Sequence, residues 1–265
     1  MPSLQSVWRH RDLLWQMTER DTRSRYRGSA AGLFWSAINP LLMLAVYTFF
    51  FSEVFQARWG SAPHTGRVDF ALILFVGLLL HGFLAESIVR APQLVVGQPN
   101  LVRKVVFPLE VLPIVAVGSA LFHFAVGFAI WLLFHLFVDG LPPATSWLLP
   151  LVVLPVAIMT LGFCWLLASL GVYLRDVTFV MPFIATVLLF ASPIFYPLQT
   201  LREPFRTIVE VSPLTFPVET ARRILFDGVP PSWSGLAVYT LIALAIAYAG
   251  LVWFQGTRKG FADVL

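Results

Sequence analysis

Long apolar runs alternate with shorter polar connections along most of this chain. A helix needs about 20 residues, at ~1.5 Å each, to cross the roughly 30 Å of hydrocarbon in a bilayer. The runs close to that length are 33–55, 70–89, 111–138, 147–170, 179–196 and 236–254. Backbone groups find no water to bond inside lipid, and these runs are too long for barrel strands. The pattern therefore predicts six transmembrane helices.

The composition agrees with this pattern and excludes an ordinary soluble domain. Of the 265 residues, 58% are hydrophobic and 12% are charged, about half the charged share usual in soluble domains. The mean hydropathy is +0.80. We expect an all-α integral membrane protein with one membrane domain, 33–265, preceded by a separate N-terminal unit, 1–32.

The N-terminal unit carries an amphipathic pattern. Its apolar residues recur at roughly helical spacing, and its arginines lie mostly elsewhere. One interpretation is a helix in the plane of the lipid headgroups, with tryptophans at the lipid boundary and arginines near phosphates. The other is a cytoplasmic helix packed on its own protein. The residues expected to matter in this helix are Trp8, Trp15, Arg23, Arg25 and Arg27.

The distribution of basic residues predicts the orientation. Lys and Arg near span ends tend to stay in the cytoplasm. With the N-terminus inside, twelve of the 18 basic residues fall on inner segments. We therefore expect both termini in the cytoplasm. The pI near 9.6 follows largely from this topology, so it does not indicate nucleic-acid binding.

The inner connection between the second and third spans is unusually long. It runs from Arg90 to Pro113, although a connection of a few residues would suffice. Pro99 and Asn100 offer a helix start, and Phe107 and Pro108 end it. A short helix with exposed apolar residues would suit docking of a soluble partner. The alternative is an ordinary amphipathic elbow between two spans.

Four motifs in order resemble one family, the membrane subunits of ABC-2 type polysaccharide exporters, and most closely those for O-antigen. The motifs are RYRGSAAGLFWSAINPLLML from Arg25, NLVRKVVFP from Asn100, YLRDV from Tyr173 and SPIFYP from Ser192. Together they extend over nearly the whole chain. Relatives often have Asn-Pro where this chain has Ser212 and Pro213, and a serine can cap a helix in a similar way.

The resemblance implies a homodimer in the bacterial inner membrane, bound to two copies of a separate ATPase. ATP and Mg²⁺ would bind on that partner, and this chain would hold no cofactor, metal or catalytic site. It also implies export of a lipid-linked glycan, with membrane lipids around the chain. The sequence contains no G-x-x-x-x-G-K-[ST] motif for ATP phosphates. The residues implied to couple to the ATPase are Asn100, Leu101, Arg103, Lys104, Phe107, Pro108, Arg175 and Asp176.

Aromatic side chains on the first and fifth spans are candidates for the substrate path. Aromatic faces offer flat apolar contact to sugar rings. The candidates are Tyr47, Phe50, Phe51, Phe190, Phe195 and Tyr196. Beyond them, the stretch 197–234 predicts two short amphipathic helices broken at Pro213. They would form either an outer gate, as the resemblance suggests, or a plain surface cap.

Ionisable residues within spans are costly and need partners. Glu86 lies four residues before Arg90, so we expect these two to pair. His123 is expected to bond a neighbouring helix. His135 and Asp139 form H-x-x-x-D without a nucleophile or metal cluster nearby. The Gly28-x-x-x-Gly32 spacing would permit close helix approach, but it often arises by chance.

Other functional classes stay open from the sequence. An ABC-2 permease for drugs or lipids shares the same architecture. An ion-coupled or proton-coupled carrier predicts paired broken helices with acidic residues at mid-membrane. A membrane-embedded transferase requires acid, base or metal groups clustered at one interface. The ABC export permease accounts best for the long inner loop and the missing ATP site.

Overall fold

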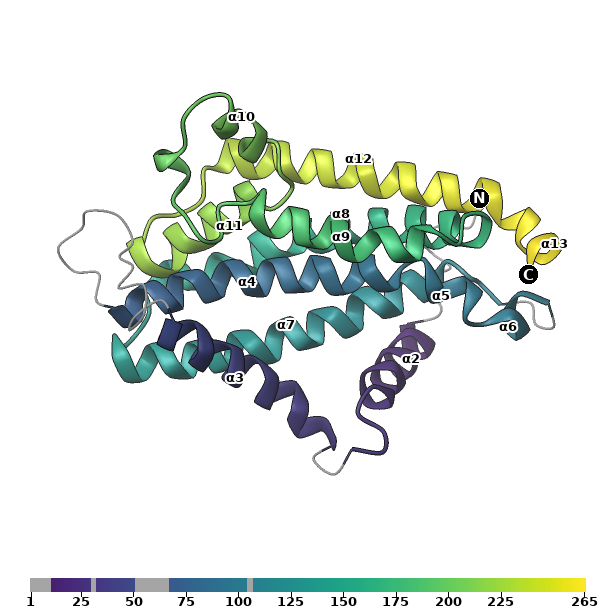
Figure 1. The fold of residues 1–265 in the computed structure, drawn as a ribbon, viewed down its shortest axis with the longest axis horizontal. Helices are drawn as coiled ribbons and strands as arrows, with labels where there is room; N and C mark the ends of the chain where they lie inside the picture. Colours follow the sequence, from purple (N-terminus) through teal and green to yellow (C-terminus); the bar gives the residue numbers. More distant parts are fainter. Residues whose placement is uncertain (1–10, 30–31, 51–66, 104–106) are drawn as a thin grey trace.

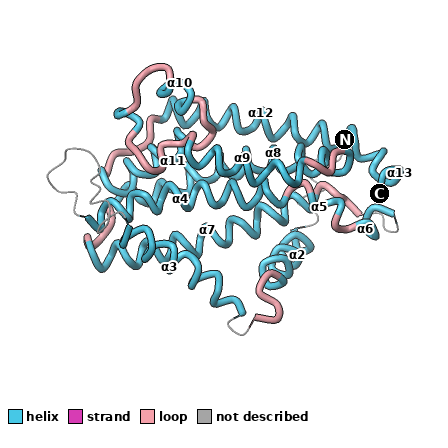
Figure 2. Tube along the Cα trace, in the orientation of Figure 1, coloured by secondary structure: helices cyan, strands magenta, loops and turns pink. Residues whose placement is uncertain are grey.

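Every regular element in the described part of this computed structural model is a helix. The structure describes residues 11–29, 32–50, 67–103 and 107–265. Figures 1 and 2 show an elongated bundle whose long helices run side by side, with helices and loops only among the described residues. The long helices are α4 (Arg67–Arg90), α7 (Val111–Val138), α8 (Leu149–Tyr173) and α12 (Trp233–Thr257).

Four of the segments are long and apolar enough to cross a membrane. They are Phe70–Arg90, Val111–Val138, Ala144–Tyr173 and Trp233–Val264. The bounds of α7 match the expected third span. The predicted first span contains the shorter α3 (Trp35–Thr48), and the part of this span from 51 onward lies outside the described residues. The described residues thus contain four long candidate spans together with shorter apolar helices.

The predicted fifth span, 179–196, is shorter than expected. Its helix α9 (Val177–Phe190) ends at Phe190, so at 1.5 Å per residue it is only ~21 Å long. The SPIFYP segment follows as a tight turn, in which the Ile194 amide donates to the Ser192 carbonyl over 2.7 Å. Proline disfavours helical backbone at the residue before it, so Pro193 explains why the helix does not continue.

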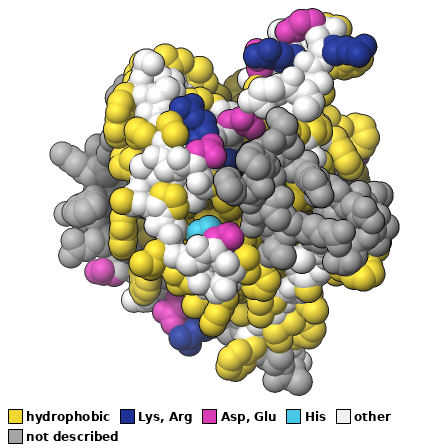
Figure 3. All heavy atoms as spheres, turned by 90° about the vertical axis from the view of Figure 1, so that its left-hand side faces the viewer, with side chains coloured by type: hydrophobic (Ala, Val, Ile, Leu, Met, Phe, Trp, Pro, Cys, Tyr) yellow, Lys and Arg dark blue, Asp and Glu magenta, His cyan; other side chains and the backbone are white. Residues whose placement is uncertain are grey.

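The end of the molecule beyond α9 consists of short elements. After the turn η4 (Leu198–Thr200), helices α10 (Phe205–Glu210) and α11 (Thr215–Arg222) are separated around Pro213, which confirms the predicted break. A π-helical turn, η5 (Arg223–Asp227), and the 3-10 helix η3 (Ala144–Leu148) complete this end. Figure 3, which looks onto it, shows charged side chains standing among hydrophobic ones.

A buried guanidinium fixes this irregular end to the bundle. Arg222 is 6% exposed. Its Nε donates to the Ile73 carbonyl over 3.1 Å, its Nη2 to the Ile194 carbonyl over 2.8 Å and its Nη1 to the Pro193 carbonyl. The side chain therefore satisfies carbonyls of α4 and of the turn after α9, where no water would otherwise reach them.

Two local possibilities raised by the sequence are not realised. Ser212 does not cap α11; its hydroxyl lies 2.8 Å from that of Ser192 instead. Gly28 and Gly32 have positive φ angles of 89° and 50°; Gly28 lies in the turn after α2 (Arg11–Ser24), and Gly32 is the first residue of the 3-10 helix η1 (Gly32–Phe34). A pair of glycines in a turn is not a helix-packing motif.

The opposite end gathers the short helices α5 (Gln93–Val96), α6 (Pro99–Arg103) and α13 (Phe261–Val264), the last of which follows the turn η6 (Arg258–Gly260). The amide of Gln93 in α5 donates to the Thr178 hydroxyl at the start of α9 over 2.9 Å. The two expected inner connections therefore lie at one end of the bundle.

Helices α8 and α12 pack backbone against backbone. A Cβ added to Gly162 would lie 2.7 Å from the Ala247 backbone, and one added to Gly250 would overlap the Gly162 carbonyl. Small residues at such crossings let helices approach closely, which supplies dispersion contacts where lipid offers no hydrophobic drive.

We expect Gly250→Ala to lower the free energy of unfolding by about 1–3 kcal/mol, because the new methyl group overpacks this contact. Gly256→Ala is the matched control, since its methyl group would meet nothing within 4 Å, and it should be neutral or stabilising by up to ~1 kcal/mol. Thermal unfolding in detergent measures both. Equal stability of the two variants would contradict the close contact.

Candidate functional site

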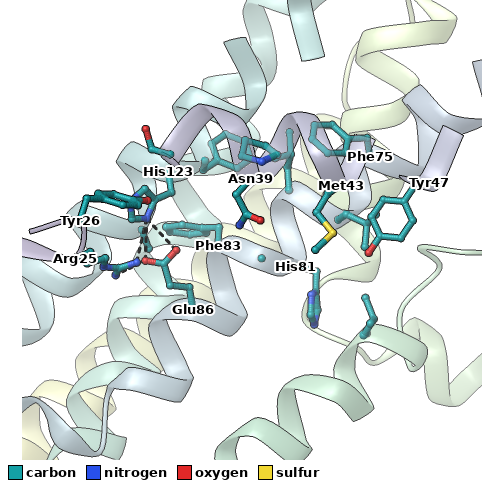
Figure 4. Close-up of a pocket in the computed structure, with 18 residues that line it drawn as sticks. Arg25, Tyr26, Asn39, Met43, Tyr47, Phe75, His81, Phe83, Glu86 and His123 are labelled. Carbon is teal, nitrogen blue, oxygen red and sulfur yellow. Dashed lines mark hydrogen bonds and ion pairs between the residues drawn. The ribbon is translucent and has the colours of Figure 1, made fainter. Parts of the chain in front are cut away.

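A polar cavity lies between α3, α4, α7 and the residues directly after α2. Its volume is about 460 Å³. Figure 4 shows its polar groups, with Arg25, Tyr26, Glu86 and His123 gathered at one side. Its lining residues are Arg25, Tyr26, Ser36, Asn39, Pro40, Met43, Tyr47, Phe75, Leu78, Leu79, His81, Gly82, Phe83, Glu86, Ala120, His123, Phe124 and Leu189.

A four-residue polar cluster forms one wall of this cavity. Arg25 makes an ion pair with Glu86, and the His123 Nδ1 lies 3.1 Å from both Glu86 carboxylate oxygens. The Tyr26 hydroxyl is 3.2 Å from the His123 Nε2, and the two rings meet edge to face at 6.0 Å. The Arg25 and Glu86 side chains are 23% and 24% exposed. The cluster joins the end of the α2 segment to α4 and α7.

The His123 ring contacts all three other members of the cluster, because the Arg25 Nη1 also lies 3.2 Å from its Nδ1. Burial raises the pKa of the Tyr26 hydroxyl above its ordinary value, so this group keeps its proton. The positive charge of Arg25 then balances the carboxylate of Glu86, which favours burial of the pair.

The other wall of the cavity is mixed in character. Asn39, Met43 and Tyr47 come from α3 (Figure 4). His81 in α4 donates from Nε2 to the Ala185 carbonyl over 2.8 Å and so reaches α9. The cavity thus has a charged side and a side of amide, phenol and thioether groups.

The predicted pairing of Glu86 with Arg90 is wrong. Arg90 instead donates from Nη2 to both oxygens of Asp21, over 2.9 and 3.0 Å. One turn along α4 separates the two side chains, and each finds a partner on the α2 segment rather than on its own helix. The expectation that His123 bonds a neighbouring helix is confirmed by its contact with Glu86.

The described part of the N-terminal helix packs on its own protein. The hydroxyls of Thr22 in α2 and Ser119 in α7 are 3.2 Å apart, and Thr18 lies against Gly118. Trp15, by contrast, is 74% exposed. Arg23 pairs with Glu19 over 2.7 Å at the surface, and Arg27 is exposed. Trp8 lies outside the described residues.

The residues expected to couple to an ATPase lie at the end of the bundle that carries α5 and α6. Asn100 in α6 is exposed, as are Arg175 and Asp176 in the turn between α8 and α9. The helix begins at Pro99 as expected. The side chain of Arg103 and all of Lys104 lie outside the described residues.

The apolar residues around α6 are less exposed than expected. Leu101 and Phe107 pack against a buried cluster that includes Val95, Leu109 and Phe261. Pro108 is half-buried. Among the side chains described in α6, Pro99 and Asn100 are exposed and Leu101 is half-buried.

The aromatic residues expected on the substrate path divide between two places. Tyr47 lines the polar cavity, and Phe50 is 46% exposed at the end of α3. Phe190 stacks on Phe195 at 5.7 Å, and the Tyr196 hydroxyl donates to the Phe190 carbonyl over 2.6 Å. Phe51 lies outside the described residues.

Phe190 and Tyr196 belong to a second, apolar groove of about 490 Å³. It is formed between the end of α9 and α10. The lining residues of this second groove are Thr186, Val187, Phe190, Ala191, Tyr196, Leu201, Phe205, Ile208 and Val209. Because the Tyr196 hydroxyl is used within the protein, what this residue offers to a ligand is mainly its ring.

The H-x-x-x-D motif at the end of α7 forms a local pair. His135 Nδ1 lies 3.1 Å from an Asp139 oxygen, and the ring stacks on Trp131 at 4.9 Å. Over the ranges that the structure describes, no three His, Cys, Asp or Glu side chains are grouped to hold a metal ion.

The sequence interpretation did not identify Tyr26 and Asn39 as cavity residues. A signal existed for the cluster, because a carboxylate within an apolar helix requires a cationic partner. The nearest candidate along α4 was Arg90, and only the fold brings Arg25 to Glu86.

We expect Glu86→Gln to destabilise the protein by about 1–3 kcal/mol, because it leaves the half-buried Arg25 without its carboxylate. The double variant Arg25→Gln and Glu86→Gln should recover part of this loss. Arg23→Gln is the control, since an exposed pair contributes ~0–1 kcal/mol. Thermal unfolding in detergent measures these variants. An equal loss of stability in Glu86→Gln and Arg23→Gln would contradict the role of the cluster.

Comparison with known proteins agrees with this architecture. Residues 12–226 match the family model described as ABC-2 type transporter. The chain is 27% identical over 262 residues to an O-antigen export system permease protein RfbA from Myxococcus xanthus, covering 98% of both chains. A protein of the same name from Klebsiella pneumoniae is 27% identical over 256 residues, covering 96% of this chain and 95% of its own. The chain thus belongs to the ABC-2 type transporter family, as a membrane permease without an ATPase domain.

Proposed function

We propose that this chain is the membrane subunit of an ABC exporter that moves a lipid-linked polysaccharide of the O-antigen class across the bacterial inner membrane. The observation that carries the proposal is the similarity, over nearly the full length, to permeases named for O-antigen export. Energy would come from ATP and Mg²⁺ bound on a separate ATPase.

The proposed topology has six membrane segments with both termini in the cytoplasm. Helices α3 and α9 are then the first and fifth segments, although each is shorter than the roughly 20 residues needed to cross a bilayer. Positive charge on Arg90, Arg175 and Arg258 supports placing their end of the bundle inside. The end with α10 and α11 would face outward and carry the outer gate.

Apolar side chains support a homodimer formed through the short helices. In α3, Leu42 is 55% exposed, and in α9, Phe179 and Phe183 are 80% and 69% exposed. Lipid or a second copy of the chain would cover such faces. We propose that two copies meet there and enclose a path bordered by Tyr47, Phe50, Phe190, Phe195 and Tyr196.

The proposed contact with the ATPase consists of α6 with the residues that follow it, and of the turn at Arg175 and Asp176. Closure of two ATPase subunits on ATP would press on both elements. Since both lie at the same end of the bundle, their displacement would tilt α4, α7, α8 and α9, whose ends they join. An ABC-2 exporter of a drug or lipid is the alternative, and it shares this coupling but differs in cargo.

Reversing the charge of the expected docking helix tests the ATPase contact. We expect Arg103→Glu with Lys104→Glu to weaken co-purification of the ATPase by about tenfold, the effect of losing ~1.4 kcal/mol, and to leave membrane insertion intact. The control is Arg202→Glu with Arg206→Glu, which reverses two charges at the opposite end. Equal ATPase recovery in both double variants would count against the docking role.

Removing two rings tests the path and the cargo together. We expect Tyr47→Ala with Tyr196→Ala to slow glycan export about tenfold while ATPase binding is kept, because each aromatic contact contributes ~0.5–1.5 kcal/mol. Tyr248→Ala is the control, since this residue in α12 is 69% exposed and lines neither cavity. Surface glycan detected by antibody is the readout. Export of a drug but no glycan by the wild type would support the alternative.

A further inference from the structure

The C-terminal end of the chain packs against the expected docking segment, which is α6 together with the described stretch 107–110. Phe261 in α13 is fully buried and lies in the same apolar cluster as Leu109 and Val95, with Leu101 and Phe107 against it. Figure 1 shows α13 beside α6 at this end of the bundle. The sequence pattern indicated no role for this end of the chain.

Arg258 makes the polar contacts between the C-terminal segment and the docking segment. Its Nη1 donates to Glu110 Oε2 over 3.0 Å, and its Nη2 donates to the Phe107 carbonyl over 3.2 Å. The Glu110 side chain is 6% exposed, so its charge depends on a close cation. One guanidinium therefore contacts both ends of the 107–110 stretch that precedes α7.

The residue before Arg258 is fixed to the other expected docking element. The Thr257 carbonyl accepts a hydrogen bond from the Tyr173 hydroxyl over 2.8 Å, and its Oγ1 lies 2.7 Å from the Ser169 hydroxyl. Tyr173 is the last residue of α8, two positions before Arg175. The end of α12 thus lies between the segment after α6 and the turn after α8.

Glu110 is also held by a side chain of α8. The indole of Trp165 in α8 donates to the Glu110 backbone carbonyl over 3.0 Å. The start of α7, the inner half of α8 and the end of α12 therefore meet at this residue. A displacement of the 107–110 stretch would reach three membrane helices through these bonds.

We propose that Arg258 is a positioning residue for coupling, which sets the 107–110 stretch against the ATPase and transmits its movement to α12. The inference rests on the proposed function. It differs from a purely structural ion pair in one respect: loss of the contact should uncouple ATP hydrolysis from export, rather than only reduce the amount of folded protein.

The test compares Arg258→Ala, Arg258→Lys and Lys259→Ala in the complex of the full chain with its ATPase. Lys259 is the matched control, because it is the neighbouring basic residue and is exposed. The measured quantity is labelled surface glycan exported per ATP hydrolysed, beside the yield of complex. We expect this ratio to fall about tenfold in Arg258→Ala, as for loss of a hydrogen bond to a charged group.

The remaining variants separate the explanations. Arg258→Lys keeps the charge near Glu110 but lacks the two-armed fork, so we expect an intermediate ratio; Lys259→Ala should match the wild type. A wild-type ratio in Arg258→Ala overturns the inference alone. If that variant does not fold, a wild-type ratio in Arg258→Lys overturns it in the same way. A wild-type chain that recruits no ATPase overturns the proposed function as well.

Discussion

Opposite charges that meet at one end of the bundle hold its separate parts together. Glu86 meets Arg25, Arg90 meets Asp21, and Glu110 meets Arg258. Each pair joins segments that are distant in the sequence. Glu110 is 6% exposed, and the side chains of the other two pairs are 23–30% exposed. A charge left alone in such a place would be costly, so the positions of α2, of the 107–110 stretch and of the C-terminal segment depend on these contacts.

At the opposite end of the bundle, which carries α10 and α11, a single arginine satisfies buried polar groups. Irregular backbone follows α9, and its carbonyls have no helical partners. Arg222 donates to Pro193 and Ile194 and also to α4. Each end of the molecule is thus organised by arginines, although at one end they neutralise carboxylates and at the other they satisfy carbonyls. Between the two ends the packing is apolar, with Trp131 as its largest fully buried side chain.

Local patterns in the sequence predicted most of the helices. The bounds of α7 follow from an unbroken apolar run, and the separation of α10 from α11 follows from Pro213, which cannot continue a helix. The sequence did not predict where α9 ends, because the run stays apolar through Ile194 and Phe195 and only the turn at Pro193 interrupts it. The apolar composition of a run shows that it can lie in lipid. Where its helix ends depends on the backbone conformations that residues such as Pro193 allow.

The candidate site was harder to predict, because its residues come from distant segments. Helical spacing favoured Arg90 as the partner of Glu86, and nothing in the pattern placed Arg25 across from it. Trp15 fitted an apolar stripe, yet α2 turns its threonines toward α7 and leaves that ring outside. The contact of Arg258 with Glu110 spans more than half the chain. Pairings of this kind are decided by the fold.

The glycine contact between α8 and α12 has a mechanical meaning. Where two helices touch through their backbones, no flexible side chains lie between them. A displacement of one helix is therefore passed directly to the other. Helix α12 spans 25 residues, or ~37 Å at 1.5 Å per residue. In the proposed topology, a small sideways displacement of the end of α12 near Arg258 would therefore be carried along the helix to Trp233 at its other end.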